Sequence, residues 1–266
     1  MYQFSYHRPD TLEEAASLFA GAEDGLYLSG GQTLIPTLKQ RLAAPSDLID
    51  LSGIDSLKGV RVDGRVVQIG AFTRHAEVVE HAEVRRVLPV LATLAGQIGD
   101  AQVRNLGTIG GSVANSDPAA DYPAAVIGLG ATLYTDKRTI EADDFFKDLF
   151  ETALVPGEIL TRIDFPVPDR AAYRKFPNPA SRYAVVGVLV ADFGGRIRVG
   201  VTGAGPCAFR ATAIETVLNA NLSPEAVRKV EVPDAGFNSD LHASAEYRAH
   251  LVRVMAERAV ADLLSG

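Results

Sequence analysis

The sequence predicts an α+β protein of two domains: an N-terminal domain with subdomains at about 1–53 and 54–168, and a small C-terminal domain of antiparallel strands and helices at 169–266. Three observations lead to this prediction. Short apolar runs and helical periodicities alternate over the first fifty residues, hairpin signals follow them, and Pro166 and Pro168 end an apolar strand. With 266 residues and 47% hydrophobic content, the chain can form more than one core.

The first subdomain is predicted to be a small βαβαβ unit. Asp10 and Glu13 match a capping box before its first helix, and Pro36 stands in an early turn of its second helix, where proline is tolerated. The expected elements are strands at 4–6, 26–28 and 47–51 and helices at 12–20 and 34–42.

Antiparallel signals dominate the rest of the chain. Asp63-Gly64 stands between two apolar runs, as in a two-residue hairpin turn, and Gly194-Gly195 separates another such pair. Residues 102–121 are small and polar, which predicts a long loop. The other expected elements are strands at 60–62, 66–69, 131–135, 159–165, 185–193 and 196–201, and helices at 74–80, 89–98, 122–129, 211–219, 224–230 and 243–264.

The composition argues against several classes of protein. The longest apolar stretches reach only about eight residues, against roughly 20 for a membrane-spanning helix, so no transmembrane segment is expected. The N-terminus shows no signal-peptide pattern, which makes a cytoplasmic location the expectation. A net charge of −7, with Lys and Arg spread along the chain, argues against a nucleic-acid partner.

Metal and thiol chemistry also lack a basis in the sequence. Cys207 is the single cysteine, which excludes an internal disulfide and an iron–sulfur cluster held by this chain's own thiolates. The five histidines are scattered, so no metal site is predicted. The sequence contains no phosphate-binding P-loop, no zinc-protease motif and no nucleophile elbow.

Two glycine pairs are the most informative feature of the chain. They lie about 80 residues apart, each beside an apolar run, in Ser29-Gly30-Gly31-Gln32-Thr33 and Thr108-Ile109-Gly110-Gly111-Ser112. A backbone without Cβ atoms can approach phosphate oxygens closely, and its N–H groups can donate charge-assisted hydrogen bonds of roughly 1.5–3 kcal/mol each. Together the pairs predict a dinucleotide held from two sides, whereas each pair alone is equally compatible with a tight turn.

Three further features each have two interpretations. Gly203-Ala204-Gly205 resembles a nicotinamide-binding fingerprint after a strand, but Pro206 removes a backbone donor there, which disfavours a Rossmann site. Asp121 precedes the expected helix at 122–129, either as its N-cap or as an acceptor for ligand hydroxyls. For Lys175, in Tyr173-Arg174-Lys175-Phe176, a solvated strand residue is the favoured interpretation and a ligand contact the other.

Three segments together point to a known family: Ser29-Gly30-Gly31-Gln32-Thr33-Leu34-Ile35-Pro36, residues 104–114 continuing to Asp117-Pro118-Ala119-Ala120-Asp121, and Asn178-Pro179-Ala180-Ser181-Arg182-Tyr183-Ala184. With them, essentially the whole chain resembles the flavin-binding medium subunit of the molybdenum hydroxylase family. This family includes aerobic carbon monoxide dehydrogenase, nicotine and quinoline oxidoreductases, aldehyde oxidoreductases and the flavin domain of xanthine dehydrogenase. The middle segment, with its Thr-Ile-Gly-Gly core, is the most specific of the three.

The resemblance implies an FAD-binding domain of the vanillyl-alcohol-oxidase (PCMH) type at 1–168, followed at 169–266 by a C-terminal domain typical of these medium subunits. It implies that the first loop binds the pyrophosphate, the second loop approaches the flavin and its phosphates, and Asp121 binds cofactor hydroxyls. Leu160 and Lys175 would contact the isoalloxazine. The implied cofactor-binding residues are Ser29, Gly30, Gly31, Gln32, Thr33, Leu34, Ile98, Thr108, Ile109, Gly110, Gly111, Ser112, Asp121, Leu160 and Lys175.

Two departures from the family pattern bear on the chemistry. Relatives that attach FAD covalently through histidine have that histidine directly after the first glycine pair, where this chain has Gln32. Non-covalent FAD is therefore expected. Ile98 matches a position where xanthine dehydrogenase has an aromatic residue that stacks on the flavin, and this difference weakens the expectation of nicotinamide docking.

The function implied by the resemblance is electron transfer within a molybdenum hydroxylase complex. A molybdenum-containing large subunit would oxidise the substrate, a small subunit with [2Fe–2S] clusters would relay electrons, and FAD in this chain would pass them to an external acceptor. The complex is expected to be a heterotrimer that dimerises. No catalytic residue is assigned in this chain, because this role requires no acid–base pair.

Two alternatives to this function remain open at the level of sequence. The first is a self-sufficient, non-covalent FAD oxidase or reductase, for which Tyr183 is the one nearby candidate base. The second is a cofactor-free assembly subunit whose glycine pairs are only turns.

Overall fold

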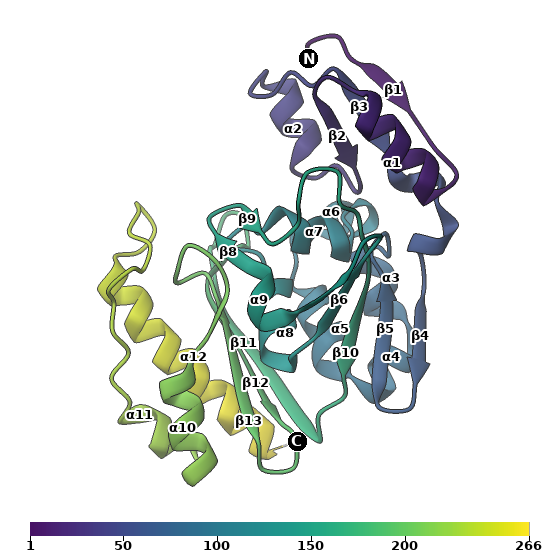
Figure 1. Cartoon of the computed structure of the whole chain (residues 1–266). Helices are drawn as coiled ribbons and strands as arrows, with labels where there is room; N and C mark the ends of the chain where they lie inside the picture. The colour runs from purple at the N-terminus through teal and green to yellow at the C-terminus, as the bar shows by residue number, and fades with distance from the viewer. Residues whose placement is uncertain (266) are drawn as a thin grey trace.

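The chain folds into a small N-terminal lobe above a larger body of two sheets and their helices (Figure 1). The computed structural model describes residues 1–265. Helices and antiparallel sheets together confirm the predicted α+β class. None of the helices in this described part combines the length and apolar character that crossing a bilayer requires.

The N-terminal lobe has the predicted βαβαβ order. Its three strands are parallel in the order β1-β3-β2, with Leu48 and Ile49 of the central strand buried. The capping box lies one residue later than predicted, because Thr11 is the N-cap and accepts a hydrogen bond from the backbone N–H of Glu14. The elements are β1 (Ser5–His7), α1 (Leu12–Gly21), β2 (Gly25–Leu28), α2 (Leu34–Lys39) and β3 (Asp47–Asp50), followed by the 3-10 turns η1 (Leu51–Gly53) and η2 (Asp55–Leu57).

The middle of the chain builds a five-stranded sheet in the order β4-β5-β10-β6-β7 with antiparallel pairings. The predicted hairpin is present, but Asp63 pairs with Val66, so the two turn residues are Gly64 and Arg65 rather than Asp63 and Gly64. Gly64 has a φ of 58°, which favours glycine. The strands are β4 (Val60–Asp63), β5 (Val66–Gly70), β6 (Thr132–Thr135), β7 (Thr139–Glu141) and β10 (Leu160–Pro166).

Helices cover one face of this sheet. The stretch 102–121, predicted to be a loop, instead contains most of α6 and all of α7, so the second glycine pair lies in the first turn of a helix. Neither helix shows an apolar period, because α6 is only six residues long with three polar side chains and α7 contains two glycines. The helices are α3 (His75–Glu80), α4 (Ala82–Val87), α5 (Pro89–Gly96), α6 (Ala101–Leu106), α7 (Ile109–Asn115), α8 (Tyr122–Leu129) and α9 (Ala142–Phe145), and a short ribbon is formed by β8 (Phe146–Asp148) and β9 (Glu151–Thr152).

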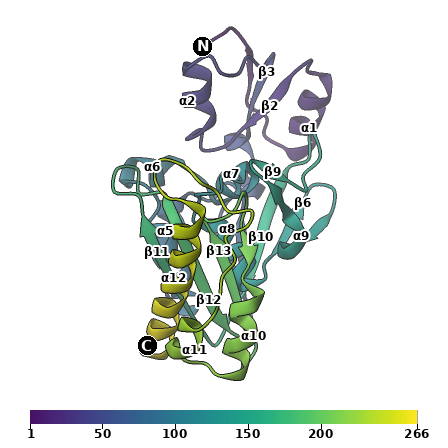
Figure 2. The ribbon, with the colours of Figure 1, turned by 90° about the vertical axis from the view of Figure 1, so that its left-hand side faces the viewer.

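The last part of the chain forms a four-stranded antiparallel sheet in the order β11-β12-β13-β14, covered on one face by three helices (Figures 1 and 2). Because β14 pairs with β13 shortly after Gly203-Ala204-Gly205, this segment does not form the strand–loop–helix of a nicotinamide-binding fingerprint. The elements are β11 (Arg170–Pro177), β12 (Ala184–Asp192), β13 (Ile197–Thr202), β14 (Phe209–Arg210), α10 (Thr212–Ala220), α11 (Pro224–Arg228) and α12 (Ala245–Ser265).

Helix α8 joins the two larger sheets into one body. All eight of its residues are buried, and it contacts both β12 and β13. A Cβ added to Gly200 of β13 would lie 2.2 Å from the Ala124 carbonyl oxygen of α8, so a glycine is needed for this close approach. Leu189 and Ala191 of β12 belong to the same core as the helices of the middle segment. This packing fixes the start of α8, and with it Asp121, at the bottom of the site described next.

Candidate cofactor-binding site

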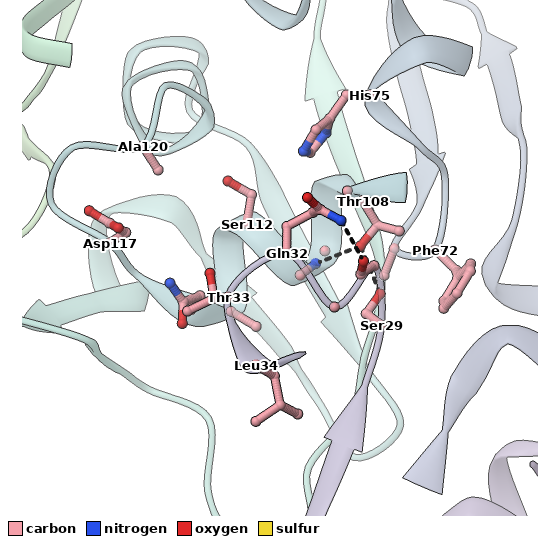
Figure 3. A pocket seen from close by; sticks show the side chains of 18 of the residues that line it. Ser29, Gln32, Thr33, Leu34, Phe72, His75, Thr108, Ser112, Asp117 and Ala120 are labelled. Atoms are coloured by element: carbon pink, nitrogen blue, oxygen red, sulfur yellow. Dashed lines mark hydrogen bonds between the residues drawn. The ribbon is translucent and has the colours of Figure 1, made fainter. Parts of the chain in front are cut away.

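A pocket of about 560 Å³ lies between the N-terminal lobe and the body of the protein. This volume is within the range of cofactor sites. One wall is formed by residues 26–34 and the opposite wall by residues of α3, α6 and α7 with their connections (Figure 3). Residues 181–183 also line the pocket. Of the residues predicted to bind a cofactor, those that line the pocket are Ser29, Gly30, Gly31, Gln32, Thr33, Leu34, Ile98, Thr108, Gly110, Gly111, Ser112, Asp121 and Leu160.

The two glycine loops meet in this pocket. The hydroxyl oxygens of Ser29 and Thr108 are 2.7 Å apart and share a hydrogen bond (Figure 3). Gly30 packs against the connection between α6 and α7, where an added Cβ would lie 2.3 Å from the Leu106 carbonyl oxygen. The contact between the loops therefore requires a glycine at position 30, whether or not a ligand is bound. The atoms in the way belong to the backbone of Leu106 and Gly107, which cannot move aside as a flexible side chain can.

The first loop supplies a row of available donors. The backbone N–H groups of residues 30–34 donate no hydrogen bond within the described chain, 1–265. All five residues line the pocket. Gly31 has a φ of 70°, a left-handed conformation that side chains disfavour, and this turn presents the row to the cavity. An anionic ligand with several oxygens can accept hydrogen bonds from such a row.

The second loop contributes differently from what the sequence predicted. Ile109 and Gly110 donate their N–H groups to the carbonyl oxygens of Thr73 and Ala71, and the Gly111 N–H donates to the Thr108 hydroxyl as an N-cap bond. These donors are thus already used within the protein. Free N–H groups are therefore present in the first loop, whereas the expectation of bare N–H donors from the second loop is wrong for Ile109, Gly110 and Gly111. The second loop offers the side chains of Thr108 and Ser112 and a surface without bulk.

Asp121 lies at the bottom of the pocket in a buried polar cluster. Its carboxylate accepts a 2.6 Å hydrogen bond from the Tyr173 hydroxyl and forms a 2.9 Å ion pair with the Lys175 ammonium. Burial raises the pKa of Asp121, while Lys175 and the Tyr173 hydroxyl act in the opposite direction. Asp121 makes no side-chain N-cap bond to α8, so simple capping does not explain its position. Its remaining lone pairs can accept a ligand hydroxyl.

Two predicted residues do not line the pocket. The Lys175 side chain is only 2% exposed, because its ammonium group is held by Asp121 and the Gln97 carbonyl oxygen. The interpretation of Lys175 as a solvated strand residue is therefore wrong. Ile109 is fully buried in the hydrophobic core, where it anchors the first turn of α7.

Several lining residues were missed at the level of sequence. Tyr27 stacks on Phe19 with ring centroids 4.9 Å apart, and His75 presents its imidazole to the cavity (Figure 3). Glu158 also lines the pocket and is fixed by two hydrogen bonds from Arg138, which lower its pKa to about 2. Isolated residues of these types carry no spacing signal, so only the tertiary contacts identify them.

Comparisons with known proteins agree with this geometry. A family model described as the FAD binding domain in molybdopterin dehydrogenase matches residues 2–168. The glyceraldehyde dehydrogenase medium chain of Sulfolobus acidocaldarius is 33% identical over 276 residues, which cover 98% of each chain. The carbon monoxide dehydrogenase medium chain of Afipia carboxidovorans is 34% identical over 282 residues, which cover 97% of this chain and 95% of that one.

A solved structure shows the same architecture. The reconstituted CO dehydrogenase from Oligotropha carboxidovorans contains a chain that matches with a TM-score of 0.91 at 34% identity, over 99% of this chain and 98% of that one. The resemblance inferred from the glycine loops is therefore confirmed along the whole length of the chain.

Proposed function

Because the chain belongs to the family of FAD-binding domains of molybdopterin dehydrogenases, we propose that it is the electron-transfer subunit of a molybdenum hydroxylase complex. In this role it takes electrons from [2Fe–2S] clusters of a partner subunit and passes them to an external acceptor. Relatives that cover nearly its whole length are named medium chains of dehydrogenases, so the chain is an oxidoreductase subunit.

The observation that carries this proposal is the row of unpaired N–H groups at residues 30–34, exposed in a pocket between two parts of the fold. A dinucleotide has a pyrophosphate group that can accept these hydrogen bonds. It also has two ring systems that an extended pocket with apolar sections can accommodate. The residues present therefore fit FAD.

When bound, FAD supplies chemistry that accepts and gives electrons one or two at a time. The chain's own residues hold and orient it: residues 30–34 bind the pyrophosphate, the Thr108 and Ser112 hydroxyls contact the polar middle of the cofactor, and Asp121 accepts from its hydroxyls. Leu34, Ile98 and Leu160 provide apolar contacts. Lys175, which the sequence suggested as a flavin contact, acts through Asp121, because its ammonium group is paired with that carboxylate.

The need for partner subunits follows from the ligand chemistry. Iron–sulfur clusters are held mainly by cysteine thiolates, and Cys207 is the only cysteine of this chain. Cys207 does not line the pocket, and burial raises the pKa of its thiol. We propose that the [2Fe–2S] clusters and the molybdenum cofactor belong to a small and a large partner subunit. We further propose that the three chains form a heterotrimer that dimerises, and that the complex is located in the cytoplasm.

Gln32 supports non-covalent attachment of FAD. An amide is not a nucleophile toward the flavin, and Gln32 stands where the family resemblance would place a histidine for covalent attachment. The domain division at about residue 168 is likewise part of the proposal, since the matching family model ends at 168.

The experiment is to purify the full chain through an affinity tag from cells that produce its natural complex. The proposal expects a yellow sample in which acid precipitation releases FAD, with molybdenum and iron bound to co-purifying chains. After removal of FAD, the complex should keep its metals but lose electron transfer to an acceptor dye. A chain that purifies alone and oxidises a substrate by itself would support the self-sufficient oxidase instead. A colourless chain that does not bind added FAD would support the assembly subunit.

A further inference from the structure

His75 is a buried polar residue on the wall of the pocket. It is the first residue of α3 and is only 4% exposed, yet its side chain contributes to the lining. Figure 3 shows the imidazole pointing into the cavity above Gln32 and Ser112. On its other side the ring packs against Tyr122, with ring centroids 5.3 Å apart.

The imidazole forms no hydrogen bond within the described residues, 1–265. Within residues 1–265, Nδ1 is fully buried and has no partner, and Nε2 takes part in no hydrogen bond. Nε2 is not among the fully buried unpaired atoms, so it is the ring nitrogen that remains accessible. A neutral imidazole carries one donor and one acceptor, and a buried polar atom without a partner costs about 1–3 kcal/mol. Because His75 lines the cavity and its Nε2 is accessible and unpaired, a group outside the protein can supply the partner of Nε2.

The ring is held in place by the junction of the two glycine loops. The His75 backbone N–H donates a 2.9 Å hydrogen bond to the Gly107 carbonyl oxygen. A Cβ on Gly107 would lie 2.7 Å from the His75 Nε2, and a Cβ on Gly30 would lie 2.7 Å from the Gly107 Cα. His75 thus packs against Gly107 and Gly107 against Gly30, and the imidazole lines the same pocket as the row of free N–H groups.

The charge state of the ring follows from its surroundings. Burial, and secondarily the positive charge of Arg104, lower the pKa of His75 to about 4. The ring is therefore neutral near pH 7. A neutral imidazole offers one directed N–H donor rather than a positive charge.

We propose that the His75 imidazole contacts the bound cofactor, with Nε2–H donating a hydrogen bond to an oxygen acceptor of the dinucleotide and thereby positioning it against the glycine loops. This inference rests on the proposed function, because it assumes that FAD occupies the pocket. The acceptor is an oxygen either of the pyrophosphate or of the flavin half of the molecule.

The test is a titration of the full-length apoprotein with FAD, in which the quenching of flavin fluorescence measures binding. His75→Phe keeps an aromatic ring against Tyr122 but removes both nitrogens, and we expect it to weaken FAD binding about tenfold, as the loss of one hydrogen bond predicts. The matched control is Tyr122→Phe, which removes a neighbouring unpaired hydroxyl that does not line the pocket. This control should bind FAD like the wild type.

Titration with ADP and with FMN distinguishes the two acceptors. Weaker binding of ADP by His75→Phe would assign the contact to the pyrophosphate, and weaker binding of FMN alone would assign it to the flavin half. Equal binding of FAD by His75→Phe and wild type would overturn the proposal. If the wild type itself binds no FAD, the proposed function fails instead.

A second measurement needs no substitution. In wild-type protein with ¹⁵N-labelled histidine, the ring nitrogen resonances of His75 should shift when FAD is added, because a hydrogen bond changes their shielding. The signals of His7, which lies in the N-terminal lobe outside the pocket lining, serve as the internal reference. Unchanged His75 resonances at saturating FAD would overturn the proposal even if the Phe variant did not fold.

Discussion

The hydroxyl groups of Ser29 and Thr108, 79 residues apart in the sequence, share a 2.7 Å hydrogen bond that joins the two glycine loops. Ser29 follows strand β2 of the N-terminal lobe, and Thr108 caps helix α7 of the body. The bond therefore links the two walls of the pocket. It also places the free N–H row of the first loop beside the compact first turn of α7.

Thr108→Val should destabilise the apoprotein more than Ser29→Ala. Loss of the N-cap bond to Gly111 costs about 1 kcal/mol, and the shared hydrogen bond is lost as well. Ser29→Ala removes the shared bond alone. Urea unfolding of both variants and of the double variant measures this, and the double variant should cost less than the sum because one bond is counted twice. Strict additivity would show that the hydroxyls do not interact.

Gly111→Val should lose FAD while the fold is retained. A side chain at this position would begin 2.8 Å from the Thr108 hydroxyl and 3.5 Å from the Ser29 Cβ, so it disturbs the loop junction and fills space next to the pocket. FAD occupancy after reconstitution and circular dichroism measure the two properties. Gly21→Val is the matched control, because nothing lies within 4 Å of that Cβ position. A yellow Gly111→Val protein would contradict the role of the second loop.

Asp121→Asn should destabilise the protein by about 3–5 kcal/mol, because it leaves the Lys175 ammonium buried without a counter-charge. Asp121→Asn combined with Lys175→Met should recover most of this loss. Denaturant unfolding of the apoproteins gives both values. If the double variant is as unstable as the single one, the ion pair is not the reason for the destabilisation.

The stability of the apoprotein should depend on pH through His75. Its pKa is about 4 in the folded protein and about 6.5 when unfolded, so the unfolded state binds more protons between these values. The contribution of His75 to the free energy of unfolding is fully present above pH 6.5 and is lost as the pH falls to 4. The loss is roughly 3 kcal/mol for the 2.5-unit difference in pKa. In His75→Phe this contribution should vanish. Identical pH profiles of the unfolding free energy in variant and wild type would contradict the pKa shift.

A fragment of residues 1–168 should not form a stable fold by itself. It contains α8, all of whose residues are buried, but lacks the β12 residues Leu189 and Ala191 that pack in the same core. We expect binding of a hydrophobic dye and no cooperative thermal transition. The full-length chain is the control, and a fragment that melts as cooperatively as the full chain would contradict this expectation.

Local signals predicted much of the secondary structure. The βαβαβ lobe, the hairpin around Gly64 and the amphipathic helices of the last part appear because period and turn chemistry act over a few residues. The helices α6 and α7 were missed, since α6 is short and half polar, α7 contains two glycines, and neither shows such a period. Helix α7 is stabilised by its Thr108 cap and by donation of two N–H groups to Ala71 and Thr73, which are distant contacts.

The sequence by itself determined the family and the two loops of the pocket, because glycine, serine and threonine at these positions encode a local backbone conformation and a lack of bulk. Only the tertiary structure decided which N–H groups remain free, that Lys175 is buried against Asp121, and that the His75 imidazole lacks a partner. These properties depend on groups that the fold brings together from far along the chain. A hydrogen-bond donor is available or used according to such neighbours, which no local pattern specifies.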